Sequence, residues 1–256
     1  MAEPRLAGKV AIVTGAGQGF GEGITKKFIQ EGSKVLLVDI NAESGERVAT
    51  AQPQGTAIFV HGDVSVETDW QKAVDRALAE FGKIDIIVNN AGVVNKAMSS
   101  IELAEQELDR LLRINVKSLY HSAKVAVPVL KKQGSGGVFV NISSISAPRP
   151  RPNLVWYAAS KGAASAATKG LAAEFAKDNI RFNAICPVVA ETAMLPLVLG
   201  GKPDTPENRN VFLASIPLGR FATPADVANA AAFLASEEAS FITGVELPID
   251  GGRSLN

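Results

Sequence analysis

Short apolar segments alternate with longer segments of helical spacing along most of this chain. The apolar segments include VAIVTG from Val10, KVLLVD from Lys34 and GVFVNI from Gly137, each bounded by polar residues or glycine. Apolar runs of about four to eight residues between such boundaries indicate buried strands. The alternation therefore predicts an α/β fold, a doubly wound Rossmann-like three-layer sandwich with a mainly parallel seven-stranded sheet.

The segments that carry helical spacing are residues 22–31, 69–81, 105–132 and 157–177. No repeat or low-complexity linker divides the 256 residues, so we expect one domain spanning residues 1–256. The segment at about 188–215 is rich in Pro and Gly and is long for a loop inside a compact domain. We expect it to form a lid over the substrate site.

The composition argues against several classes of partner. Lys plus Arg and Asp plus Glu both number 26, so no net field favours nucleic acid. No segment approaches the roughly 18 apolar residues of a membrane span. The single cysteine, Cys186, cannot form an internal disulfide, and His61 and His121 lack partners at metal-binding spacing. We therefore expect a cytoplasmic protein without metal, membrane or nucleic-acid partners.

A glycine-rich loop, TGAGQGFG, follows the first apolar segment and precedes a helical pattern. Glycines let the backbone approach a pyrophosphate closely, and a helix N-terminus offers unpaired N–H groups and a partial positive charge. The spacing is G-x-x-x-G-x-G, which departs from the common G-x-G-x-x-G fingerprint of dinucleotide sites. The predicted contacts in this loop are Gly15, Gln18, Gly19 and Phe20.

The second apolar segment ends at Asp39, 24 positions after Gly15. A carboxylate there would accept hydrogen bonds from the adenosine ribose hydroxyls and repel a 2′-phosphate. Gln18 is neutral, although the sequence alone leaves open whether Lys34 or Arg47 approaches the 2′ position. NAD is therefore the predicted cofactor, in preference to NADP.

Further candidates follow the next two apolar segments. Asp63 and Val64 end the third segment, where they would hold the adenine amino group, and Asn90, Ala91 and Gly92 end the fourth. The carboxyl ends of the strands form the ligand-binding edge of an open α/β sheet. These residues are therefore expected to line the same cofactor site.

A Y-x-x-x-K motif, Tyr157 with Lys161, opens a helical pattern, so both side chains project from one helix face. A phenol with a pKa of about 10 is a poor base at neutral pH, but nearby positive charge stabilises its phenolate. Ser144 ends the preceding strand, where its hydroxyl would hydrogen-bond a substrate oxygen. Together the three residues predict an acid/base site.

These motifs, with NNAG, Asn115 and YAASK, resemble in order and spacing the single-domain short-chain dehydrogenase/reductase family. The tail PLGRFATPADVANAAAFLASEEASFITGVELPIDGG is similar as well, so the resemblance runs from about Gly8 to Gly252. It implies that Tyr157 is the acid/base and that Lys161 lowers its pKa and holds the nicotinamide ribose. In the same way Ser144 would orient the substrate, and Asn115 would hold a water for proton relay.

The resemblance also implies contacts to the nicotinamide region from Pro187, Ala190 and Thr192. One departure stands beside them, because Val188 takes the place of the family's usual glycine after the proline. This replacement puts the local backbone path in question. The resemblance further implies a homotetramer in which helices 105–132 and 157–177 pack between subunits.

The segments expected around the nicotinamide are mostly apolar, which favours a secondary alcohol or ketone with a substantial carbon skeleton. The candidate lining residues are Val93, Val94, Met98, Ile145, Leu154, Trp156, Met194 and Leu195. Arg149 and Arg151 lie between Ser144 and Tyr157 in the sequence. Either arginine would clamp an acidic group of the substrate or face solvent.

The sequence thus predicts an NAD-dependent oxidoreductase that moves a hydride between nicotinamide and a secondary alcohol or ketone. One alternative is an NADPH-type reductase of carrier-bound 3-oxoacyl chains, which Asp39 disfavours. Another is a non-catalytic dinucleotide sensor, which would have no need of Ser144, Tyr157 and Lys161.

Overall fold

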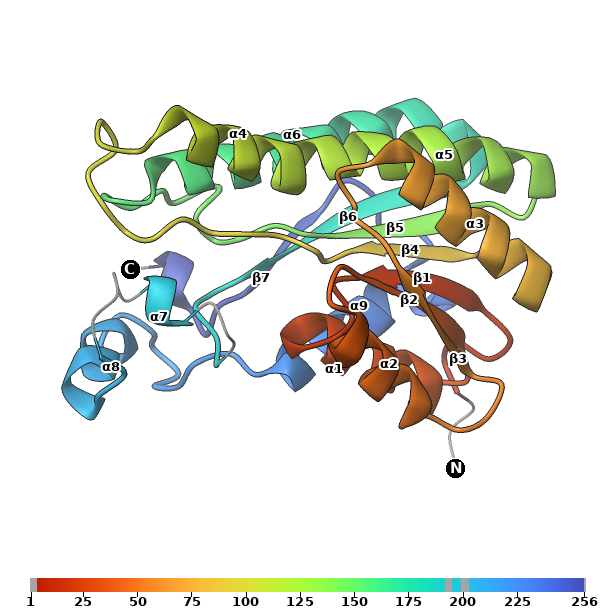
Figure 1. Cartoon of the computed structure of the whole chain (residues 1–256), viewed down its shortest axis with the longest axis horizontal. Coiled ribbons are helices and arrows are strands. Elements are labelled where there is room, and N and C mark those ends of the chain that lie inside the picture. The colour runs from red at the N-terminus through yellow and green to blue at the C-terminus, as the bar shows by residue number, and fades with distance from the viewer. Residues whose placement is uncertain (1–3, 192–194, 199–202, 256) are drawn as a thin grey trace.

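A computed structural model describes residues 4–191, 195–198 and 203–255, and it contains a seven-stranded sheet between two layers of helices (Figure 1). The spatial order is β3-β2-β1-β4-β5-β6-β7, and every neighbouring pair is parallel. The strands are β1 (Val10–Thr14), β2 (Lys34–Asp39), β3 (Ala57–His61), β4 (Ile86–Asn89), β5 (Gly137–Ile142), β6 (Ile180–Pro187) and β7 (Glu246–Ile249). The predicted doubly wound Rossmann-like sandwich is confirmed, and the order reverses between β1 and β4, where such sheets bind ligands.

The central strands are buried on both faces because helices cover the sheet on each side. All residues of β1 and β4 are buried, whereas the edge strand β3 is only partly so. This is why the central segments read as continuous apolar runs with no polar alternation.

The helices divide between the two faces (Figure 1). On one face lie α1 (Gly19–Gln30), α2 (Ala42–Thr50) and α9 (Pro224–Ala235), and on the other lie α3 (Glu67–Phe81), α4 (Glu105–Leu112), α5 (Ser118–Gln133) and α6 (Val155–Phe175). Phe28 of α1 and Val227 of α9 fill the first core, and Trp70 of α3 and Leu130 of α5 fill the second. Each face therefore has its own apolar layer against the sheet.

The segment 105–132, predicted as one helix, is divided by a π-helix, η1 (Arg113–Lys117), which separates α4 from α5. The prediction that this segment is helical is confirmed, and the π-turn within it has no sequence signature of its own. Such turns are common at functional sites, and this one contains the predicted site residue Asn115. The other predicted helices match α1, α3 and α6, with small shifts at their ends.

In its described parts, the segment at 188–215 contains two short helices, α7 (Leu195–Val198) and α8 (Pro206–Leu213). Thr205 caps α8, and Thr223 with Asp226 forms a capping box that starts α9. Short 3-10 turns complete the chain: η2 (Ala176–Asp178), η3 (Glu237–Ala239) and η4 (Arg253–Leu255). None of the helices described combines the length and hydrophobicity that a membrane crossing requires.

Candidate active site

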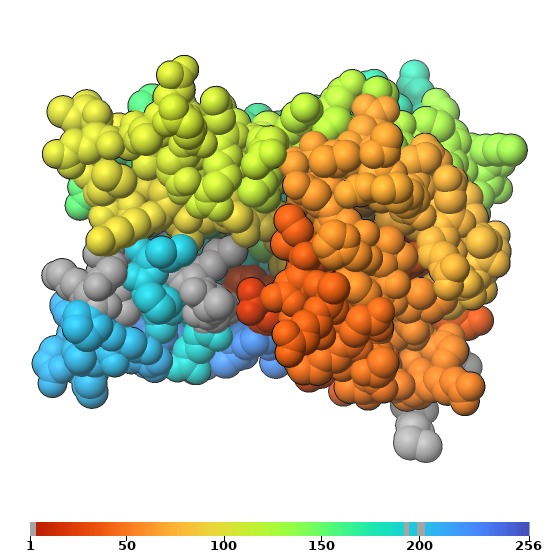
Figure 2. Space-filling model, viewed as in Figure 1, coloured from red at the N-terminus to blue at the C-terminus, as the bar shows by residue number. Residues whose placement is uncertain are grey.

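The ends of the strands open into one cavity of about 580 Å³, bordered on its far side by the α7 and α8 segment. In the space-filling view this segment (blue) and the α2 and α3 region (orange) occupy opposite halves of one face (Figure 2). The predicted cofactor residues that line the cavity are Gly15, Gln18, Gly19, Phe20, Asp39, Asp63, Val64, Asn90, Ala91, Gly92, Tyr157, Lys161, Pro187 and Ala190. Thr192, the remaining one, lies outside the described residues.

The glycine loop between β1 and α1 is open to a ligand only because side chains are missing from it. Gly15 has a φ of 62°, a conformation that favours glycine, and a Cβ there would lie 2.9 Å from the Ala91 Cα. A Cβ on Gly21 would overlap the Gly15 carbonyl oxygen. No side chain caps α1 at Gln18, so the helix presents bare N–H groups at the cavity. The loop therefore fits the pyrophosphate of a dinucleotide.

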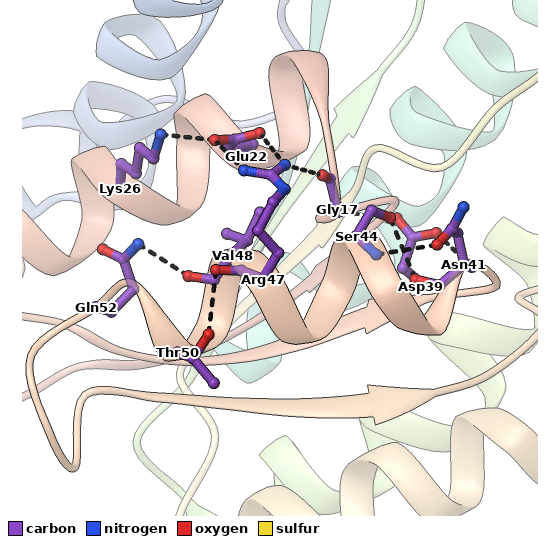
Figure 3. Close-up of polar contacts among 10 residues, drawn as sticks. All are labelled: Gly17, Glu22, Lys26, Asp39, Asn41, Ser44, Arg47, Val48, Thr50 and Gln52. Carbon is purple, nitrogen blue, oxygen red and sulfur yellow. Dashed lines mark hydrogen bonds and ion pairs between the residues drawn. The ribbon is translucent and has the colours of Figure 1, made fainter.

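The end of β2 is tied to this loop by Asp39 (Figure 3). The Asp39 carboxylate accepts hydrogen bonds from the Gly17 N–H at 2.8 Å and the Asn41 N–H at 2.9 Å. The Asn41 side chain in turn caps α2 by accepting from the Ser44 N–H. These contacts hold the carboxylate at the cavity wall, where its remaining lone pairs can accept further bonds.

Beside Asp39, Arg47 is held by the chain itself (Figure 3). Its Nη2 donates to the Gly17 carbonyl and to a Glu22 carboxylate oxygen, each at 2.9 Å. Lys26 pairs with the other Glu22 oxygen at 2.6 Å. The hydrogen bond from Arg47 is the main cause that lowers the pKa of Glu22. Arg47 and Lys26 are thus both already paired with the Glu22 carboxylate.

Asn90, at the end of β4, braces the glycine loop from the opposite strand. Its Nδ2 donates to the carbonyls of Thr14 at 2.8 Å and Gly15 at 3.0 Å. The Thr14 hydroxyl accepts from the N–H groups of Asn90 and Ala91, both at 3.1 Å. The side-chain amide of Asn90 therefore positions the loop, a role that its place in the NNAG motif did not reveal.

Tyr157 and Lys161 lie one turn apart at the start of α6 and both face the cavity. Lys161 is 6% exposed, and its Nζ donates to the Ile142 carbonyl at 2.8 Å. Burial lowers the pKa of Lys161 to about 8. A Cβ on Gly92 would lie 3.2 Å from this Nζ, so the absence of a side chain there leaves the ammonium accessible.

The surroundings of the Tyr157 phenol shift its pKa in opposite directions. Burial is the main cause, and it raises the pKa of Tyr157, whereas the neighbouring Ser144 hydroxyl and then the Arg151 charge lower it. Ser144 lies two residues beyond the end of β5, and its Oγ accepts a hydrogen bond from the Ser146 N–H at 3.1 Å. Ser144, Tyr157 and Lys161 therefore meet on one wall of the cavity, as the sequence predicts.

Asn115 differs from these three because it is buried and does not line the cavity. Its Nδ2 donates to the Val93 carbonyl at 2.8 Å and the Ser160 hydroxyl at 2.9 Å, and its Oδ1 accepts from the Val93 N–H at 2.8 Å. Both amide donors are thus engaged within the protein. The side chain braces the segment after β4 against α6.

The predicted apolar lining is correct only in part. Val93, Ile145, Leu154 and Leu195 line the cavity, and Met194 lies outside the described residues. The residues that do not line it are Val94, Met98 and Trp156. Val94 is buried, and the Trp156 indole points away to donate to the Ser100 carbonyl at 2.8 Å. Sequence proximity to the site did not reveal these side-chain directions.

Val188 is accommodated without a glycine-like conformation. Its φ is not positive, its N–H donates to the Ile249 carbonyl at 3.1 Å, and its side chain packs in a small cluster with Leu195, Ile216 and Phe221. The backbone path that this replacement put in question is therefore continuous with β6. Cys186 nearby is buried, and burial raises the pKa of its thiol to about 11.

Both candidate arginines, Arg149 and Arg151, line the cavity, and Arg253 joins them from η4. Arg253 had no sequence signal because it lies more than a hundred positions from this loop and belongs to no motif. The described residues include no cluster of three or more His, Cys, Asp or Glu residues placed to hold a metal ion.

Comparison with known proteins relates this chain to oxidoreductases. Residues 15–254 match a family model described as enoyl-(acyl carrier protein) reductase. The chain is 47% identical over 249 residues to 4-formylbenzenesulfonate dehydrogenase of Comamonas testosteroni, covering 96% of this chain and 98% of that protein. It is 37% identical to meso-2,3-butanediol dehydrogenase of Serratia marcescens, covering 98% and 97%.

Solved structures agree with this relationship. A 3-ketoacyl-(acyl-carrier-protein) reductase from Brucella melitensis, complexed with NADH, has a TM-score of 0.91 and 44% identity, covering 97% of this chain and 99% of that one. Levodione reductase has a TM-score of 0.93 and 30% identity, covering 98% and 99%. The chain therefore belongs to the short-chain dehydrogenase/reductase family and is an oxidoreductase that uses a nicotinamide cofactor.

Proposed function

We propose that this protein is an NAD(H)-dependent oxidoreductase that interconverts a secondary alcohol and a ketone, with Ser144, Tyr157 and Lys161 as catalytic residues. The supporting observation is that these three side chains share one cavity with the glycine loop and Asp39. A sensor of dinucleotides would need the loop but not the acid/base set. Catalysis is therefore favoured over sensing.

In the proposed reaction a bound nicotinamide supplies the hydride acceptor, or the donor in reverse. Ser144 hydrogen-bonds the substrate oxygen and orients it towards Tyr157. Tyr157 takes the hydroxyl proton as the carbon loses its hydride, and returns a proton to the oxygen in the reduction direction. The alcohol thus loses one hydride and one proton in all.

Lys161 would hold ribose hydroxyls and stabilise the Tyr157 phenolate. Its position at the Ile142 carbonyl and beside Gly92 places a positive charge deep in the cavity. The proton relay expected at Asn115 would have to use its main-chain carbonyl, since the side-chain amide braces Val93 and Ser160. The sequence had not distinguished the side chain of Asn115 from its main chain in this role.

NAD rather than NADP is the proposed cofactor because of the charges beside the ribose. The Asp39 carboxylate lies at the cavity wall, and Arg47 is paired with Glu22. A 2′-phosphate would meet a carboxylate and find its nearest described guanidinium already engaged. Asp63 and Val64 also line the cavity, in keeping with an adenine pocket.

A carrier-bound 3-oxoacyl substrate is the second candidate, because a 44% identical neighbour is named for that reaction. That neighbour is complexed with NADH, so preference for NAD does not exclude this reading. Relatives are named for cyclic and acyclic alcohols, such as cyclopentanol and 2,3-butanediol, and for an aromatic aldehyde. A secondary alcohol of moderate size is the reading that we favour.

The test is reduced-nicotinamide absorbance with NAD+ and NADP+ in parallel, across secondary alcohols and hydroxyacyl thioesters. We expect turnover with NAD+ and a loss of at least about 100-fold in Tyr157→Phe, because the proton acceptor is removed. Cofactor binding should survive this substitution. Full activity of the variant would refute the role of Tyr157, and preference for NADP+ would refute that of Asp39.

One domain, a cytoplasmic location, a lid at 188–215 and a homotetramer stay predictions. Light scattering of the purified protein tests the assembly, and a monomer would contradict it.

A further inference from the structure

The substrate end of the cavity gathers three arginines from two distant segments. Arg149 and Arg151 come from the loop before α6, and Arg253 comes from η4 near the end of the chain. The acidic residues among the described lining are Asp39 and Asp63, both at the cofactor end. In the parts of the chain that the structure describes, none of these three arginines forms an ion pair within 4.0 Å.

Several other arginines of this protein form ion pairs, whereas Arg113 and Arg181 form none among the described residues. Arg47 pairs with Glu22, Arg209 pairs with Asp204 and Glu191, and Arg220 pairs with Asp226. Among the described lining residues, the substrate end of this cavity therefore holds guanidinium groups without a carboxylate.

Arg151 is held firmly in the cavity wall. Its Nη2 donates to the Val198 carbonyl of α7 at 2.7 Å, and its guanidinium lies 5.0 Å from the centre of the Phe212 ring of α8. A guanidinium has five N–H donors, so most of its hydrogen-bonding capacity is left over after this contact. A cation that is partly withdrawn from water without a counter-charge is costly, and an anionic ligand would offset that cost.

The surroundings of Arg151 reinforce this point. Burial lowers its pKa, and the positive charge of Arg253 lowers it further, which places the two guanidinium groups near each other. The Arg149 Nη1 donates to the main-chain carbonyl of Arg253 at 3.1 Å, so the two segments are joined. Arg151 also influences the Tyr157 phenol. The arginines therefore lie within reach of a small molecule that contacts Tyr157.

We infer that the substrate carries an anionic group, a carboxylate or a sulfonate, and that Arg151 binds this group with Arg253 at the substrate end of the cavity. The planar fork of Arg151 suits bidentate binding of either oxyanion. The inference rests on the proposed function for the reaction at Tyr157. It adds the requirement that the substrate be negatively charged, which does not follow from the catalytic residues or from the cofactor residues.

The first experiment compares secondary benzylic alcohols that carry a para carboxylate, sulfonate or carboxamide and otherwise match in shape. We expect kcat/KM for the two anions to exceed that for the carboxamide by about 10- to 100-fold, the range of one charge-assisted pair of hydrogen bonds. In Arg151→Met this preference should collapse, and in Arg151→Lys it should be intermediate. Arg76→Met, which removes a surface pair with Glu80 on α3, is the matched control and should keep the preference.

The second experiment measures binding without turnover, by calorimetry of the NAD+-saturated protein with benzoate, benzenesulfonate and benzamide. Tighter binding of the two anions that is lost in Arg151→Met supports the inference even if none of the alcohols is oxidised, an outcome that would refute only the proposed function. Turnover of all three alcohols at similar kcat/KM overturns the inference and leaves the proposed function intact. An equal loss of all three ligands in folded Arg151→Met and Arg151→Lys also overturns it, since Arg151 would then merely anchor α7.

Discussion

The two ends of the cavity differ in whether their charged side chains have partners within the protein. At the cofactor end, Asp39 is bound by two N–H groups and Arg47 is paired with Glu22, so charges are satisfied within the chain (Figure 3). At the substrate end, Arg151 and Arg253 face the cavity with main-chain carbonyls as their described partners. The charged side chains named at the first end already have partners within the chain, whereas the guanidinium groups at the second have no described carboxylate partner. Substitutions at the first end should therefore disturb the protein's own structure or its choice of cofactor, and substitutions at the second end should change its choice of substrate.

The strongest test of the cofactor end is Gly21→Ala. The new Cβ would overlap the Gly15 carbonyl oxygen, and backbone in a glycine loop cannot move aside cheaply. We expect a loss of about 3 kcal/mol or more in the free energy of unfolding, with loss of NAD+ binding. Urea unfolding and cofactor titration measure the two effects.

The control for this loop is Gly170→Ala on α6, where a Cβ meets no atom within 4 Å. There the same substitution should stabilise the protein by about 0.5 to 1 kcal/mol. Equal effects at both positions would show that the loop is not closely packed.

Lys161→Met tests the junction between the two ends. Burial depresses the pKa of Lys161 from 10.5 to about 8, so charging it destabilises the folded protein below pH 8. This cost shrinks between pH 8 and 10.5 and vanishes above, because the unfolded chain then no longer binds the extra proton. Allowing for the lost hydrogen bond to Ile142, we expect the variant to be more stable at pH 7 by about 2 kcal/mol.

The same variant should have lost turnover, since its ammonium is gone. Denaturant unfolding at several pH values gives the measurement. If the wild type were more stable than the variant at pH 7, Lys161 would not be a charged group with too few partners. If the difference in unfolding free energy stayed constant from pH 7 to 11, the lowered pKa of Lys161 would be contradicted.

Asp39→Asn sharpens the comparison with the smallest change. The amide can still accept from the Gly17 N–H, but it no longer repels a 2′-phosphate. We expect the ratio of kcat/KM for NAD+ over NADP+ to fall by about tenfold. Asp75→Asn on the outer surface of α3 serves as the control. If both variants keep the wild-type ratio, Asp39 does not determine the preference for NAD+.

Much of the fold follows from local patterns in the sequence. Buried strands, glycine turns and helical spacing are short-range signals, so the sheet was predicted correctly, and the placement of Gly15, Tyr157 and Lys161 beside one cavity was predicted as well. The π-turn at Asn115 was not, since it leaves the apolar spacing almost unchanged. Trp156 was misplaced for a related reason, because a motif fixes position along the chain but not the direction of a side chain at a helix end.

What the sequence by itself determined is the kind of protein: a parallel sheet with a glycine-rich loop after its first strand, and Tyr157 and Lys161 on one face of a helix. These features depend on residues close together in the chain, whose spacing sets their geometry. Only the tertiary structure decided that Glu22 pairs with Arg47 and that Arg253 lines the same cavity as Arg151. Charge balance in a cavity is a sum over residues that are neighbours only after folding, so no local pattern can report it.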